Sequence, residues 1–143
     1  MLCNVPVSID HLALPAADAE TSARWFAEIL GLAAPQPDGS DEGMFNVRLN
    51  DSSSVLFVSG PAGPGHHVAF AVSAAEFTAI ADRLRRRGVD FGNDPEDPTN
   101  GQTERRAGQP GARVLSQSRW PLLRGDCVDL ESVRTHQAAR PMC

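Results

Sequence analysis

The sequence predicts an α+β domain built from two similar modules, each opening with a strand that leads into a helix. The segment His67–Phe70 repeats the pattern of His11–Leu14, His-x-Ala-apolar, 56 residues further along the chain. A helical pattern follows each copy, and Gly31 and Gly88 end these patterns at nearly equal distances after the two histidines. A length of 143 residues fits one domain.

The first module is predicted to continue from its helix into two strands. Val7, Ile9 and the run His11–Leu14 have the apolar, β-branched character of a half-buried strand. Asp18 is a candidate N-cap for a helix ending at Gly31. Apolar and polar residues alternate over residues 45–49, and an apolar run follows over 55–58. The expected helix stripe is Ser22, Phe26, Ile29 and Leu30.

The second module begins with the same order of elements. The segment Ser73–Glu76 has the form of a capping box at the start of a helix. Three arginines, 85–87, fall in its last turn, where cations suit the helix dipole. Residues 92–111 have the composition of a loop. Within a single domain 1–143 we therefore expect a module at 7–58, a linker at 59–65, a module at 66–134 and a tail at 135–143.

Composition excludes several functional classes. The net charge of −5 argues against binding of nucleic acid or of a membrane surface through a basic patch. The apolar stretches are far shorter than the roughly 18 residues of a transmembrane helix, and the N-terminus lacks a secretory pattern. The three cysteines, Cys3, Cys127 and Cys143, are odd in number and form no CxxC pair. A disulfide framework is therefore not expected, and we expect a cytoplasmic protein.

Four motifs together resemble a known superfamily. They are Asp10-His11, SARWFAEILGL at 22–32, VRLNDS at 47–52 and HHVAF at 66–70. Residues 7–112 are similar to the vicinal oxygen chelate superfamily, which includes glyoxalases, bleomycin- and fosfomycin-resistance proteins and extradiol-type dioxygenases. Within it they resemble the dioxygenases that tailor aromatic polyketides. The resemblance implies two βαβββ modules whose sheets curl around a divalent metal and a substrate cavity.

The same resemblance implies that His11 and His67 are metal ligands. Two histidines and one carboxylate leave coordination positions open on one face and suit Fe(II), with Mn, Ni or Zn as alternatives. His66 competes with His67, but side chains alternate along a strand, and the His-x-Ala-Phe register favours His67. Arg48, Asn46 and His66 are the predicted substrate-binding residues, whereas no catalytic residue is assigned.

The third ligand departs from the family pattern. Members of the family carry a glutamate after a PDGH motif in a late strand, and Gly125 stands at that position here. Residues 115–125 show no strand alternation. Glu131, within the strand-like stretch 128–133, is the candidate replacement, ahead of Asp126 and Asp129. The alternative is a tail translated in a shifted frame, because the neighbouring reading frame from Arg113 can spell RVYFLSPDGHYYEVIV, which contains the motif and its glutamate.

The resemblance implies a metal-dependent, dioxygenase-type enzyme that performs oxidative C–C cleavage or rearrangement of a polycyclic aromatic polyketide in antibiotic biosynthesis. A glyoxalase-like or fosfomycin-resistance-like metalloenzyme is an alternative on the same fold. A non-enzymatic drug-binding resistance protein, which needs a cavity but no metal, is another. The expected partners are a small aromatic substrate and a second copy of the chain, in a homodimer whose sites combine His11 of one subunit with His67 of the other.

Overall fold

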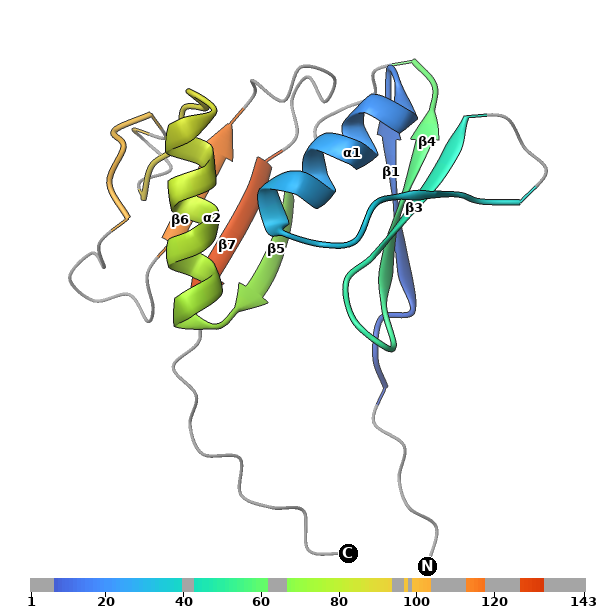
Figure 1. Cartoon of the computed structure of the whole chain (residues 1–143), viewed down its shortest axis with the longest axis horizontal. Coiled ribbons are helices and arrows are strands. Elements are labelled where there is room, and N and C mark those ends of the chain that lie inside the picture. The colour runs from blue at the N-terminus through green and yellow to red at the C-terminus, as the bar shows by residue number, and fades with distance from the viewer. Residues whose placement is uncertain are drawn as a thin grey trace, which may run out of the picture. The chain divides into compact units, whose positions relative to one another are not determined.

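The computed structural model describes residues 7–39, 43–61, 67–93, 97, 99–103, 113–117 and 127–132 (Figure 1). For His67 and for the last two of these segments the description covers the backbone. The chain forms two compact units, Met1–Gly63 and Pro64–Cys143. The division between them falls inside the range 59–65 that the sequence suggests as a linker.

The first unit is a βαβββ module. Its elements are β1 (His11–Ala16), α1 (Ala19–Leu30), β2 (Gln36–Pro37), β3 (Met44–Arg48) and β4 (Ser54–Ser59). The sheet has the order β1-β4-β3-β2, in which β1 and β4 are parallel and the other pairs antiparallel. The predicted α+β fold class is confirmed by this arrangement.

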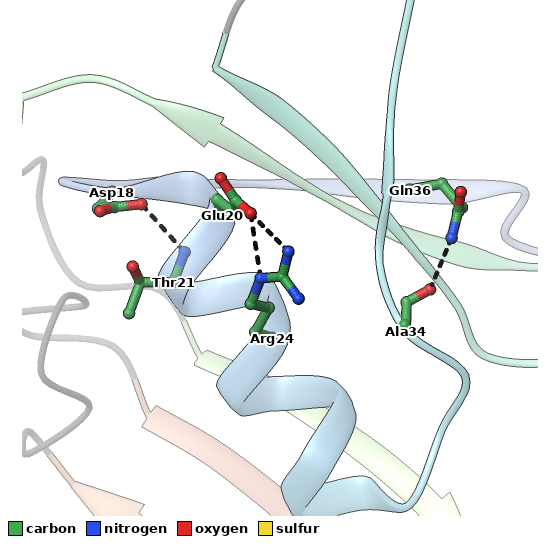
Figure 2. Close-up of polar contacts among 6 residues, drawn as sticks. All are labelled: Asp18, Glu20, Thr21, Arg24, Ala34 and Gln36. Carbon is green, nitrogen blue, oxygen red and sulfur yellow. Dashed lines mark hydrogen bonds and ion pairs between the residues drawn. The ribbon is translucent and has the colours of Figure 1, made fainter.

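Local capping fixes both ends of α1. The Asp18 carboxylate accepts a hydrogen bond from the backbone N–H of Thr21 at 3.0 Å, and Arg24 donates to Glu20 one turn earlier (Figure 2). Gly31 ends the helix with φ of 69°, the left-handed conformation that glycine adopts without a Cβ clash. The helix therefore begins and ends where the sequence predicts.

One face of the first sheet forms the core against α1. The rings of Phe26 on α1 and Phe57 on β4 meet edge to face, with their centroids 5.4 Å apart. Leu14, Val47 and Val55 fill the same face and are buried. Because side chains alternate along a strand, His11 lies on the opposite face of this sheet.

Each edge strand of the first sheet carries a proline. The carbonyls of Asp10 and Ala16 accept hydrogen bonds from the N–H groups of Ser54 and Gly60, so the even-numbered residues of β1 direct their backbone groups toward β4. Because this direction alternates along a strand, the odd-numbered residues, Pro15 among them, direct their backbone groups away from the sheet. On the other edge, the N–H of Asp38 donates to Met44 on β3, so Pro37 also faces away from the sheet. Neither proline interrupts the ladder, because its missing N–H points to the outer side.

The second unit repeats the plan with β5 (His67–Val72), α2 (Ala74–Arg86), β6 (Arg113–Gln117) and β7 (Cys127–Ser132). Its sheet has the order β5-β7-β6, with β5 and β7 parallel. The predicted capping box is present, with Ser73 and Glu76 bonding each other's backbone. A counterpart of β2 is not among the strands that the structure describes in this unit.

Two sequence predictions about strands were wrong. The first strand begins at His11, and Val7 and Ile9 before it are 103% and 72% exposed, because no neighbouring strand covers them within the described residues. Residues 115–117, at the start of the stretch expected to lack strand alternation, belong to β6 (Arg113–Gln117), because this strand pairs with β7. The predicted strand at 128–133 corresponds to β7. In the part of the chain described, no helix is long and apolar enough to cross a membrane.

Candidate functional site

A row of three residues crosses the first sheet on the face away from α1. His11 is the Cα partner of Ser54 on β4, and Ser54 is in turn the partner of Arg48 on β3. Laterally paired residues project to the same face, and strands lie about 4.8 Å apart, so the Cα atoms of His11 and Arg48 are separated by about 10 Å. The structure therefore brings two of the predicted site residues to one end of one face.

The imidazole of His11 makes one hydrogen bond that orients its ring. Its Nδ1 lies 2.8 Å from Oδ2 of Asp10, and the two side chains are 59% and 90% exposed. The Asp10 carbonyl accepts a hydrogen bond from the backbone N–H of Ser54 at 3.0 Å. The backbone of β4 thus fixes the main chain at Asp10.

Arg48 and Asn46 occupy the same face as His11, as alternate residues of β3. Nη2 of Arg48 donates to the backbone carbonyl of Asp51 at 3.2 Å, and Nδ2 of Asn46 donates to Oγ of the buried Ser54 at 3.3 Å. Both contacts hold polar groups on this face. An arginine and an amide so placed can bind an anionic or phenolic oxygen.

The side chain of Asn50 stabilises the turn between β3 and β4. Oδ1 of Asn50 accepts hydrogen bonds from the backbone N–H groups of Ser52 and Ser53, both at 2.9 Å. Because this turn joins β3 directly to β4, it sets the antiparallel register in which Ser54 pairs with Arg48.

In the second unit, the backbone register gives each strand residue its neighbour. His67 is the Cα partner of Cys127, Ala69 that of Asp129 and Ala71 that of Glu131. At about 3.3 Å per residue, the Cα of Glu131 lies about 13 Å along β7 from that of Cys127. The register thus places Glu131 four residues beyond the position opposite His67.

The remaining predicted site residues lie outside the described residues. This applies to His66, to Asp126 and to Gly125, where the family glutamate was expected. Among the described side chains, no group of three or more His, Cys, Asp or Glu residues could hold a metal ion. His11 fits a metal ligand by the chemistry of its ring, since Nδ1 faces a carboxylate and leaves Nε2 for coordination.

Sequence reasoning missed two residues of this site. Ser54 joins His11, Arg48 and Asn46, but its place depends on strand pairing, which no local pattern reveals. Asp10 precedes His11 directly, and the Asp-His pair was visible in the sequence as a signal. The contact between the two side chains is seen only in the structure.

Comparison with known proteins identifies solved structures of the same fold. The protein described as oxidase ChaP-H1 is 30% identical, with a TM-score of 0.70, and the match covers 90% of this chain and 98% of that one. Oxidase ChaP-H2 is 24% identical, with a TM-score of 0.72 and coverage of 91% and 96%. The fosfomycin resistance protein FosX from Listeria monocytogenes shares the fold at 13% identity, a TM-score of 0.65 and coverage of 92% and 94%.

No curated protein matches the chain. The family model of the Glyoxalase/Bleomycin resistance protein/Dioxygenase superfamily matches residues 8–111. This range contains the βαβββ module and the start of its repeat, including both strands that begin at a histidine. The 30% identity to one oxidase and the general metal dependence of the superfamily support an enzyme that uses a metal. The chain belongs to the glyoxalase/bleomycin resistance protein/dioxygenase superfamily.

Proposed function

We propose that the protein is a metal-dependent, dioxygenase-type enzyme that cleaves or rearranges a C–C bond of a polycyclic aromatic substrate of the polyketide type, in antibiotic biosynthesis. The observation that carries this proposal is the 30% identity to oxidase ChaP-H1 over 90% of the chain. The polar face around His11 supports it, because a phenolic substrate needs a metal ligand and hydrogen-bond donors on one surface.

In this proposal His11 and His67 bind the metal, taken to be Fe(II). When bound, such an ion supplies Lewis-acid and redox chemistry to a substrate with two adjacent oxygens. Arg48 binds a phenolate or carboxylate oxygen through its guanidinium N–H groups. Nδ2 of Asn46 donates to Ser54, and in this proposal its amide oxygen accepts a hydrogen bond from a substrate hydroxyl. His66 is proposed as a further substrate contact.

The test is anaerobic reconstitution with Fe(II), followed by addition of dioxygen and a panel of polycyclic phenols and quinones. We expect retained iron, oxygen uptake that requires both iron and an aromatic substrate, and a product with a cleaved or rearranged ring by mass spectrometry. An iron-loaded protein that consumes no oxygen with any member of the panel would contradict the oxygenase.

Variants of the three histidines test the ligand assignment. His11→Ala and His67→Ala are each expected to abolish metal binding, whereas His66→Ala should leave most of it. Because His66 adjoins His67 in the sequence, it is the matched control for loss of one imidazole. Stoichiometric metal in the His67→Ala variant would show that His67 is not the ligand from the second module.

The third ligand has two candidate sources that experiments can separate. The first is Glu131, although the register sets it four residues from the partner of His67. The second is a glutamate at position 125, encoded in the neighbouring reading frame. The family match ends at residue 111, just before the shifted frame would begin, and this supports the second source. Resequencing the gene around codon 113 tests it, and an intact frame combined with metal loss in Glu131→Gln would establish Glu131.

Drug binding without catalysis is the second candidate function. It is favoured by Gly125, which stands at the position where the family carries a glutamate. Metal analysis of the purified protein separates the two functions. Tight binding of an aromatic drug by a metal-free protein, with no effect of His11→Ala, would favour the resistance protein.

A further inference from the structure

We propose that Asp10 is a positioning residue that fixes the imidazole of His11 in the tautomer needed for metal binding through Nε2. The inference rests on the proposed function, since it gives His11 a metal to bind. It concerns a residue that the ligand assignment leaves without a role.

The short contact defines where the proton of the imidazole lies. Nδ1 of His11 and Oδ2 of Asp10 are 2.8 Å apart, the usual length of a charge-assisted hydrogen bond. A carboxylate oxygen accepts hydrogen bonds, so the proposal places the ring hydrogen on Nδ1 as the donor of this contact. In the neutral ring Nε2 then holds the lone pair, which is the form that coordinates a metal.

The backbone around the pair is fixed before any metal binds. The Asp10 carbonyl is held by the N–H of Ser54 at 3.0 Å, and His11 begins the parallel ladder as the partner of the same serine. Both residues are therefore anchored to β4. With the backbone fixed, the Asp10 carboxylate stays within reach of Nδ1. Its contact with the ring limits rotation of the imidazole and favours one tautomer before a metal binds.

Because the side chains of Asp10 and His11 are exposed, a positioning role can be distinguished from a role in folding. With side chains that are 59% and 90% exposed, an ion pair contributes little to folding. Removing the Asp10 carboxylate should therefore leave the free energy of unfolding almost unchanged. The effect should appear in the ring and in its affinity for a metal.

The first measurement uses the metal-free protein. Long-range proton–nitrogen NMR correlation of the imidazole rings, recorded at alkaline pH, distinguishes the Nδ1–H from the Nε2–H tautomer. The chain has four histidines, and the His11 signal is identified by its loss in His11→Gln. We expect the Nδ1–H form in the native protein, a shift toward the Nε2–H form in Asp10→Ala, and partial return of the native form in Asp10→Glu.

The second measurement is titration with Co²⁺ alone. Asp10→Ala should weaken Co²⁺ binding about 10- to 100-fold, the usual effect of losing a second-sphere partner. Asp38→Ala is the matched control, because it removes the same charge at the end of the first sheet opposite to His11. Its tautomer and its affinity should both equal those of the native protein.

The outcomes separate this inference from the proposed function. A native tautomer in Asp10→Ala, or an altered tautomer with unchanged Co²⁺ affinity, would overturn the role of Asp10 and leave the metal site intact. Equal losses in Asp10→Ala and Asp38→Ala would also overturn it, since a general charge effect would then explain both. Failure of the native protein to bind Co²⁺ would instead remove the metal site itself, and with it the role of Asp10.

Discussion

The stability of α1 depends on the exposed carboxylate of Asp18, which caps its first turn. The backbone N–H of Thr21 donates to this carboxylate, and the bond lowers the pKa of Asp18 below its ordinary value of 3.8. A group whose pKa is lowered by folding favours the folded state wherever it is ionised. Its contribution is therefore complete above the ordinary value and is lost as pH falls through the lowered pKa.

We predict that Asp18→Ala lowers the free energy of unfolding at neutral pH and has a smaller effect in strong acid, where the native cap is already protonated. Urea denaturation at both pH values measures this difference. Asp18→Asn is the control, because its side chain still caps the helix but does not titrate in this range. An Asp18→Ala effect that is equal at both pH values would contradict the linkage.

Among the elements, the hydrogen bonds that link the start of β3, the end of β4 and the start of α1 involve Gly43. Gly43 has φ of 96°, and its carbonyl accepts a hydrogen bond from the N–H of Ser59 at 2.8 Å. Oγ of Ser59 in turn accepts a hydrogen bond from the backbone N–H of Ala19 at the start of α1. A Cβ atom at Gly43 would lie 3.0 Å from Cβ of Ser59, so a larger residue would disturb this link between strand and helix.

We predict that Gly43→Ala destabilises the protein by more than the roughly 1–2 kcal/mol expected for a side chain in a left-handed conformation. Gly39→Ala is the matched control, because Gly39 has φ of 69° but no atom within 4 Å of its added Cβ. The difference between the two variants in urea denaturation isolates the contact with Ser59. Equal losses of stability would show that this contact is readily accommodated.

Elements set by neighbouring residues were predictable, whereas those set by distant pairing were not. Asp18, Gly31 and the capping box at Ser73 act within one helical turn, so both helices were placed correctly from the sequence. The strand at 113–117 depends on β7, ten or more residues away, and its own pattern gave no signal. The same limit applies to the site, because the row that joins His11 to Arg48 requires the register of β4.

At the scale of the whole molecule, we propose a homodimer in which His11 of one subunit and His67 of the other serve one metal. Small units with modest cores gain stability when a second chain covers them. The two parallel ladders have the same length, and each begins at its histidine, so His11 and His67 occupy equivalent positions within their own units.

We predict that His11→Ala and His67→Ala proteins, each unable to bind metal, recover about one site per heterodimer when their subunits are exchanged. One interface would then contain both native histidines and the other would contain neither. Light scattering establishes the dimer, and metal analysis after confirmed exchange counts the sites. A monomer, or no recovery of metal after exchange, would contradict sharing.

The outward-facing prolines at both edges of the first sheet have a consequence for handling the protein. A strand from another molecule cannot extend this sheet easily on either side, because Pro15 and Pro37 offer no N–H and place a ring where that strand would pass. Concentrated solutions should therefore resist fibril growth from this sheet. Replacing both prolines with valine should shorten the storage life of the protein and raise thioflavin fluorescence, even where the fold and the metal affinity are kept.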